Sequence, residues 1–244
     1  FENMLDARFK MIKNLRPSDL FLDINAANMN NKPLVIRQSL TSYRKAMKAI
    51  IDHVDEVLFP SNAAKNIALQ VYEIKNYIRV IPHDNSTENA SKICFTKDIN
   101  FNECSRIKIA VIGAIGGNKG AYTLFDICRC IYEHNFPIDI YVVGFSCNDN
   151  EIKGYSFVHI VGKYDEEDFP KIVKDFNINH SLFLSPWPET FSYTLSLAFD
   201  NELWPFVLNT GAPAERVIDS GFGTILTSAD VDEICRQILD EAHL

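Results

Sequence analysis

The chain has 244 residues, of which 47% are apolar and 23% are charged. This composition is typical of a globular protein with one large domain or two small ones. The formal net charge of −8 argues against a nucleic-acid-binding protein, which would normally carry a basic surface. No apolar run approaches the roughly 18 residues that a membrane-spanning helix needs, so we expect no transmembrane segment.

The N-terminal segment FENMLDARFKMIKNL is charged throughout. A signal peptide would have an apolar central region, so we expect an internal helix here instead. Because position 1 is Phe rather than Met, the sequence is expected to be a fragment, or a chain whose start was not recorded.

The spacing of cysteines and histidines argues against a metal site. The six cysteines form no C-x-x-C pair. Cys128 and Cys130 are two residues apart on an expected helix, so they should point to different faces. None of the six histidines has an H-E-x-x-H or similar spacing. The sequence therefore predicts free thiols in a reducing compartment and no protein-bound metal ion.

Strands and helices alternate through residues 106–244. Residues 107–113 form a continuous apolar run that ends in glycine, as expected for a parallel strand covered on both faces. Further strands are expected at 138–144, 157–162, 181–185, 205–209 and 224–227, with helices at 121–132, 165–177, 212–221 and 229–242, and a corner and helix at 185–200. Such alternation requires a parallel sheet with helices on both faces. The predicted fold class is α/β, with a Rossmann-like domain over 106–244.

The part of the chain before residue 106 divides into two segments. Residues 43–84 follow the pattern helix, strand, helix, strand, which is typical of the end of another α/β unit. Residues 85–105 are polar, rich in Asn and Ser, and aperiodic, which indicates a linker. We therefore expect a partial N-terminal α/β domain over 1–84 and a linker over 85–105.

The corner after the first strand of the Rossmann-like domain, GAIGGNKG at 113–120, is rich in glycine. Ligands of open parallel sheets bind beyond the carboxyl ends of the strands. Gly113, Gly116 and Gly117 would let the backbone approach a ligand there, and Lys119 adds a positive charge close to the start of the next helix. These features suit a diphosphate, although the spacing is neither G-x-G-x-x-G nor a Walker A loop. The alternative is a flexible glycine turn.

A second corner, SPWPETFS at 185–192, precedes an apolar helix. Glu189, Thr190 and Ser192 lie at the expected helix start, where an acid and hydroxyls are ordinary caps. By itself, this corner favours capping over a binding site.

A third corner, NTGAPAERV at 209–217, places Gly211 at the end of a strand. Proline in the first helical turn is again normal for a helix start. Glu215 and Arg216 are expected to be solvated.

The order of these motifs resembles the donor-binding half of retaining glycosyltransferases of family 4. The elements that carry the resemblance are VIGAIGGNKG, IYVVGFS, VGKYDEED, LSPWPETFSYTLSLAF and NTGAPAERV. They are especially similar to the branch that builds O-antigen and other surface polysaccharides, whose members read W-P-E-T-x-x-Y-x-L-x-E-A and G-A-P-A-E-R. VDEVLFPSNAAKNI and VIPHD also resemble the end of such an enzyme's N-terminal domain and its linker. The resemblance implies the GT-B architecture, in which two Rossmann-like domains face each other across a cleft.

The resemblance also implies roles for the matching residues. Lys119 would hold the diphosphate of the sugar donor, with Gly116 and Gly117 allowing close approach. Glu189 corresponds to the first acid of the family's E-x7-E motif, which accepts hydrogen bonds from hydroxyls of the transferred sugar. Lys119 and Glu189 are therefore the expected catalytic residues.

The remaining donor-site residues are expected on the same corners. The backbone amides of Phe191 and Ser192 would help to bind the phosphates, and Gly113, Thr190 and Gly211 would complete the site. Family members stabilise the departing nucleoside diphosphate with basic side chains and helix dipoles, without a metal ion.

Two positions depart from the family pattern. The second acid of E-x7-E, which usually holds the ribose hydroxyls, is Leu197 here. The frequent Arg after the first strand's glycine is Ala114, which removes one phosphate ligand. No acceptor pocket is identifiable in residues 1–60. These departures favour the alternative of a non-catalytic binding or scaffold module that kept the fold.

The leading hypothesis is nonetheless a metal-independent hexosyl- or deoxyhexosyltransferase of polysaccharide or glycoconjugate biosynthesis. Its partners would be a nucleotide-sugar donor, which is a substrate and not a cofactor, and a glycan or lipid-linked acceptor. The expected location is the cytoplasm or the inner face of the membrane. An NAD-dependent oxidoreductase is disfavoured, because the glycine spacing is wrong and no acid closes the second strand to bind a ribose.

Overall fold

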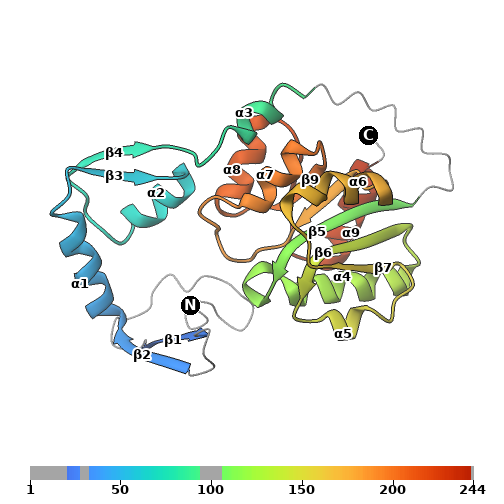
Figure 1. The fold of residues 1–244 in the computed structure, drawn as a ribbon, viewed down its shortest axis with the longest axis horizontal. Helices are drawn as coiled ribbons and strands as arrows, with labels where there is room; N and C mark the ends of the chain where they lie inside the picture. The colour runs from blue at the N-terminus through green and yellow to red at the C-terminus, as the bar shows by residue number, and fades with distance from the viewer. Residues whose placement is uncertain (1–20, 28–32, 94–105, 243–244) are drawn as a thin grey trace. The chain divides into compact units, whose positions relative to one another are not determined.

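The computed structural model describes residues 21–27, 33–93 and 106–242. The chain splits into two compact units (Figure 1), one of Phe1–Phe59 and Lys65–Ile81 and the other of Pro60–Ala64 and Pro82–Leu244. The helix expected within the first fifteen residues lies outside the described residues, as do Cys94 and Cys104.

The first unit contains two small sheets. Strands β1 (Phe21–Ala27) and β2 (Pro33–Ser39) pair in antiparallel fashion and lead into helix α1 (Leu40–Ile51). Strands β3 (Glu56–Phe59) and β4 (Tyr77–Val80) pair in parallel. Helix α2 (Asn62–Leu69) connects them and begins with residues of the second unit. The predicted order of helix, strand, helix and strand is confirmed.

The second unit is built on one six-stranded parallel sheet. Its strands are β5 (Ile107–Ile115), β6 (Ile138–Ser146), β7 (Val158–Gly162), β8 (His180–Phe183), β9 (Trp204–Leu208) and β10 (Thr224–Leu226). Their order across the sheet is β10-β9-β8-β5-β6-β7, and every neighbouring pair is parallel. Renumbered from β5, this is the Rossmann order 3-2-1-4-5-6, which confirms the predicted fold class.

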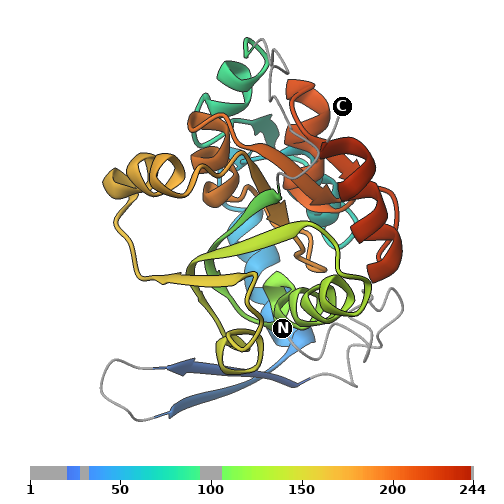
Figure 2. The ribbon, with the colours of Figure 1, turned by 90° about the vertical axis from the view of Figure 1, so that its right-hand side faces the viewer.

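Helices cover both faces of this sheet. The main ones are α4 (Ala121–His134), α6 (Phe169–Phe176), α7 (Tyr193–Asp200), α8 (Gly211–Ser220) and α9 (Val231–Ala242). In Figure 2, α4 and α9 lie to the right of the strands and α6 lies to their left. A short helix, α5 (Asp149–Ile152), lies between the expected strands at 138–144 and 157–162, where no helix was predicted.

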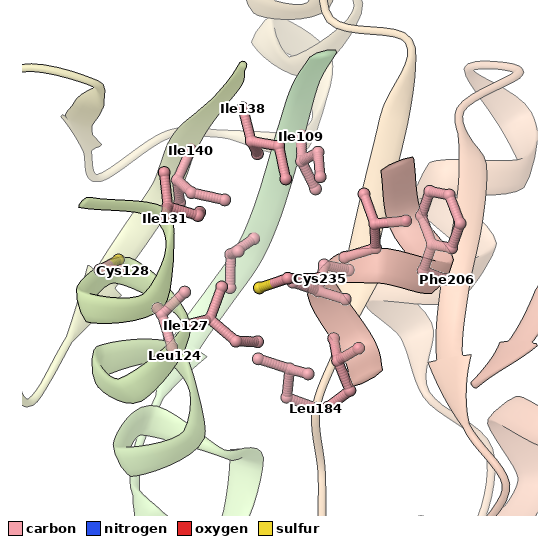
Figure 3. Close-up of a cluster of buried hydrophobic side chains, with 14 of the residues drawn as sticks. Ile109, Leu124, Ile127, Cys128, Ile131, Ile138, Ile140, Leu184, Phe206 and Cys235 are labelled. Atoms are coloured by element: carbon pink, nitrogen blue, oxygen red, sulfur yellow. The ribbon is translucent and has the colours of Figure 1, made fainter. Parts of the chain in front are cut away.

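The continuous apolar strands supply two cores because successive side chains point to opposite faces. Ile107, Ile109 and Val111 enter the first core with α4 and α9, shown in Figure 3. Ala110 and Ile112 enter the second core, on the face covered by α6, α7 and α8. Side chains on both faces must be apolar, which is why the run at the start of the domain shows no alternation.

Part of the expected linker belongs to the second unit. Residues Ser86–Ala90 form helix α3, in which Ser86 and Ala90 are buried. Ala90 packs into the second core. The linker interpretation therefore does not hold for these residues, and residues 94–105 lie outside the described part of the chain.

Cys128 and Cys130 are both buried and belong to the first core, so the expectation that they point to different faces finds no support. Cys128 enters the first core, and Cys130 contacts Asp232 of α9. Among the residues that the structure describes, no helix combines the length and the apolar character needed to cross a bilayer.

We expect Ile109→Ala to lower the free energy of unfolding by about 2–5 kcal/mol, because it leaves a cavity in the first core. Ile109 is 0% exposed. The matched control is Ile218→Ala on α8, where the side chain is 64% exposed and the change should stay within about 0.5 kcal/mol. Urea unfolding of both variants measures the difference, and equal losses would contradict the assigned core.

Candidate functional site

The chain reverses its direction across the sheet between β5 and β8. From β5 it continues to β6 and β7 on one side, then returns to β8, β9 and β10 on the other. The crossovers after β5 and β8 therefore leave in opposite directions and open a crevice at the carboxyl ends of these strands, where ligands of such sheets bind. Lys119 follows β5 and Glu189 follows β8.

The loop after β5 is held tightly against the segment after β8. Gly120, in the left-handed region with φ of 84°, is the N-cap residue of α4. A Cβ at this position would lie 2.3 Å from the carbonyl oxygen of Leu184, so only glycine allows this approach. Ser185 Oγ donates to the carbonyl oxygen of Asn118 at 3.0 Å. These contacts place the two predicted corners side by side.

Lys119 and Glu189 form an ion pair in this crevice. Lys119 Nζ lies 3.8 Å from Glu189 Oε2, and the side chains are 34% and 16% exposed. A partly exposed pair of this length adds little to stability. The pair matters chemically because one ligand could contact both an ammonium group and a carboxylate.

The pair lines a pocket of about 350 Å³. Lining residues that the sequence predicted are Lys119, Glu189, Thr190, Phe191 and Ser192. Four others were not predicted as site residues, namely His83, Trp187, Tyr193 and Thr194. Three of these four, Trp187, Tyr193 and Thr194, lie within or just after the Trp-Pro-Glu-Thr stretch. Their closeness to Glu189 in the sequence could have indicated that they belong to the site. For His83 the sequence offered no signal beyond its place in VIPHD.

Aromatic rings form one wall of the pocket. His83 stacks on Tyr193 with ring centroids 5.5 Å apart and an interplanar angle of 16°. The His83 ring also meets Phe191 edge-on at 4.9 Å. Tyr193 is 63% exposed, so its ring remains available to a flat apolar ligand surface.

The capping interpretation of the second corner finds no support in the geometry. Ser192 is the N-cap residue of α7, with φ of 72°, and makes no side-chain capping hydrogen bond. Its hydroxyl lies 3.4 Å from Thr194 Oγ1. Glu189 pairs with Lys119. The acid and hydroxyls at this helix start therefore face the pocket rather than the helix amides.

None of the predicted glycines is among the lining residues of the pocket. A Cβ on Gly211 would lie 2.7 Å from the backbone nitrogen of Glu189, and Ala212 N donates to the Glu189 carbonyl at 2.8 Å. Gly211 therefore positions Glu189. A Cβ on Gly113 would lie 3.2 Å from the methyl group of Thr194. Direct contact of Gly113, Gly116, Gly117 or Gly211 with a donor stays a prediction.

Arg216, which we expected to be solvated, is buried under the start of α7, so that prediction is wrong. Its Nη1 donates to the carbonyl oxygens of Phe191 and Ser192 at 3.2 and 2.8 Å. Its guanidinium carbon lies 4.1 Å from the centroid of the Phe191 ring. Arg216 Nη2 also donates to Ser196 Oγ at 3.0 Å. One side chain thus fixes the backbone that follows Glu189.

The same guanidinium anchors α3. Arg216 Nε donates to Thr87 Oγ1 at 2.8 Å, and Nη2 donates to Ser86 Oγ. Asp84 Oδ1 lies 3.6 Å from Nη2, and Ser196 Oγ donates to the other Asp84 oxygen at 2.6 Å. Residues 84–87, in the segment expected to be the domain end and linker, therefore hold the pocket wall through Arg216.

Burial and charge oppose each other in this network. Desolvation lowers the pKa of Arg216 to about 10, although the charges of Asp84 and Asp200 act to raise it. Burial by itself would raise the pKa of Asp84, but hydrogen bonds from Ser196 and Ser86 and the charge of Arg216 leave that pKa below its usual value. The ionised forms of both groups are thus favoured at neutral pH.

Glu215, also expected to be solvated, caps the start of α2. It accepts hydrogen bonds from Asn62 N at 2.8 Å and Ala63 N at 2.5 Å. Ser61 Oγ accepts from Ala64 N at 3.0 Å and donates to the Thr190 carbonyl oxygen at 2.8 Å. The first turn of α2 is thereby tied to a residue that lines the pocket.

Solved structures of known proteins resemble this chain. No protein-family model and no curated protein matches its sequence. HepE from Anabaena, in complex with UDP and glucose, is 15% identical with a TM-score of 0.60, over 84% of this chain and 59% of its own. Sucrose-phosphate synthase from Thermosynechococcus elongatus is 18% identical with a TM-score of 0.61, over 84% of this chain and 54% of its own. The pneumococcal O-GlcNAc transferase GtfA, in complex with UDP and GlcNAc, is 14% identical with a TM-score of 0.53, over 89% of this chain and 44% of its own.

These similarities establish the fold. The parallel sheet of the second unit matches the Rossmann-like C-terminal domain of GT-B glycosyltransferases, as predicted. The chain spans only 44% to 59% of the length of these three structures.

We expect Arg216→Met to lower the free energy of unfolding by about 3–5 kcal/mol, because it removes the guanidinium hydrogen bonds to two carbonyls and leaves Asp84 without its ion-pair partner. Arg216→Lys keeps the charge but lacks the planar fork of donors. Its free energy of unfolding should therefore lie between those of Arg216→Met and the parent protein. The control is Arg129→Met, a 55% exposed side chain whose loss should change stability by less than about 1 kcal/mol. Urea unfolding that shows equal losses for Arg216→Met and Arg129→Met would rule out this anchoring role.

Proposed function

We propose that this chain forms the donor-binding part of a retaining, metal-independent glycosyltransferase. The single observation that carries the proposal is the pairing of Lys119 with Glu189 in one pocket at the β5–β8 reversal. The transferred group would be a hexosyl or deoxyhexosyl residue from a nucleotide sugar. The acceptor would be a glycan or a lipid-linked glycan, in polysaccharide or glycoconjugate biosynthesis at the cytoplasmic side of the membrane.

Lys119 and Glu189 suit the two ends of such a donor. An ammonium group next to the start of α4 would stabilise the charge that develops on the diphosphate as the bond to the sugar breaks. The amides at the start of α7, behind Phe191 and Ser192, would add donors for the same phosphates. The Glu189 carboxylate would accept hydrogen bonds from sugar hydroxyls, which holds the reacting carbon in place.

Two structural neighbours support a nucleotide-sugar donor. HepE and GtfA were each determined with UDP together with a sugar. UDP is therefore the first nucleotide to test. The exposed ring of Tyr193 beside His83 gives the pocket an apolar side as well as a charged one.

A non-catalytic module remains the alternative, on the basis of two residues. Leu197 replaces the second acid of E-x7-E, and its side chain packs against the second core. Ala114, in place of the frequent Arg, is exposed. Both changes remove groups that would hold a nucleotide, while Lys119 and Glu189 are kept.

We expect Lys119→Met to weaken UDP binding by about 10- to 100-fold, because a charge-assisted hydrogen bond to phosphate contributes about 1.5–3 kcal/mol. Glu189→Gln should leave UDP binding unchanged or slightly tighter, since the carboxylate no longer competes for Lys119. It should lower sugar transfer by about 100-fold or more. Calorimetric titration with UDP and a transfer assay on the full-length protein separate the two effects.

The matched controls are Lys153→Met and Glu233→Gln, which change the same residue types outside the pocket. If both pocket variants transfer sugar as fast as the parent protein, the assignment of this pocket as the donor site is wrong. If UDP, GDP, dTDP and ADP all fail to bind saturably, the non-catalytic alternative replaces the proposal.

A further inference from the structure

A second group of reactive side chains lies where α4 ends and α9 begins. Cys130 and His134 are four residues apart on α4, so they share one face of the helix. Asp232 lies in the first turn of α9, which packs against α4 in the first core. One potential ligand atom from each of the three residues lies within 4.8 Å of the other two.

The contacts within this group are polar and specific. Cys130 Sγ donates to Asp232 Oδ1 at 3.2 Å. His134 Nε2 lies 3.7 Å from the same carboxylate oxygen. Cys235 of α9 belongs to the same buried cluster as Cys130. In Figure 3, Cys235 lies in the core that faces α4, one turn along α9 from Asp232.

Ordinary helix electrostatics explains only part of the arrangement. A histidine at the end of α4 and an aspartate at the start of α9 each complement a helix dipole. Neither explains why a buried thiol points at that carboxylate.

We propose that Cys130, His134 and Asp232 form a binding site for Zn²⁺. Thiolate, imidazole and carboxylate are all zinc ligands, at metal distances of about 2.0–2.3 Å, and tetrahedral geometry then separates the ligand atoms by about 3.5 Å. The side chains of His134 and Asp232 are 42% and 56% exposed, so they are free to rotate the remaining distance. Water would fill the fourth position.

The charges and protons of Zn²⁺ binding at this site can be fully accounted for. The Cys130 thiol releases one proton to solvent when its sulfur binds the ion as a thiolate. The thiolate and the carboxylate then neutralise Zn²⁺, which suits a partly buried position. Cys235, from the same buried cluster, would donate a hydrogen bond to the bound sulfur and hold it in place.

The role of this site would be to fix α9 against the rest of the domain. Cys130 and His134 lie near the opposite end of α4 from Lys119, about 20 Å away along a helix of 1.5 Å rise per residue. The ion would therefore take no part in sugar transfer. The proposal is independent of the proposed function, and either one can fail alone.

Titration with Co²⁺, a coloured substitute for Zn²⁺, tests the site directly. We expect one Co²⁺ per chain, a thiolate-to-cobalt charge-transfer band, release of one proton, and displacement of the cobalt by Zn²⁺. Zn²⁺ should also raise the melting temperature. Cys130→Ser should remove the charge-transfer band, and His134→Gln and Asp232→Asn should each weaken binding by at least about 10-fold.

The control is Cys147→Ser, which changes an exposed free cysteine outside the group and should bind cobalt like the parent. If Cys130→Ser folds poorly, the exposed changes His134→Gln and Asp232→Asn still decide the outcome. Absence of the charge-transfer band in the parent protein overturns the proposal. Equal binding by the parent and by all three ligand variants overturns it as well.

Discussion

The shape of the pocket depends on one buried cation. Arg216 holds the carbonyl oxygens of Phe191 and Ser192, the residues that turn the chain from Glu189 into α7. A buried guanidinium is tolerated only when its donors and charge are matched, so the hydroxyls around it and Asp84 are constrained as well. The carboxylate of Glu189 thus stands on a backbone that has little freedom to move.

Topology brings the two charged residues together. Lys119 and Glu189 follow strands that are neighbours only because the chain returns to the other side of β5 after completing β7. Gly120 and Ser185 then close the distance between the loops. The site is therefore a property of the strand order first and of local sequence second, as in other Rossmann-like sheets.

Sequence patterns predicted the elements whose stability is local or periodic. The apolar runs of β5 and β6 and the amphipathic pattern of α4 agree with the structure. Helix α3 was missed because residues 86–90 are mostly polar and too few to show a period. That helix forms because Ser86 and Thr87 meet Arg216 and Ala90 enters the second core. These partners lie far along the chain from residues 86–90, Arg216 by more than a hundred residues. No local sequence pattern therefore indicates the contacts.

The sequence by itself determined the parallel α/β architecture and the corners that carry Lys119 and Glu189, because side-chain periodicity and glycine placement act over a few residues. Only the tertiary structure decided that Glu189 pairs with Lys119 and does not cap α7, that Arg216 is buried, and that His83 joins the pocket. It also brought together Cys130 and Asp232, which are 102 residues apart in the sequence. Each of these depends on which elements pack together, and long-range packing leaves no signature in residue spacing.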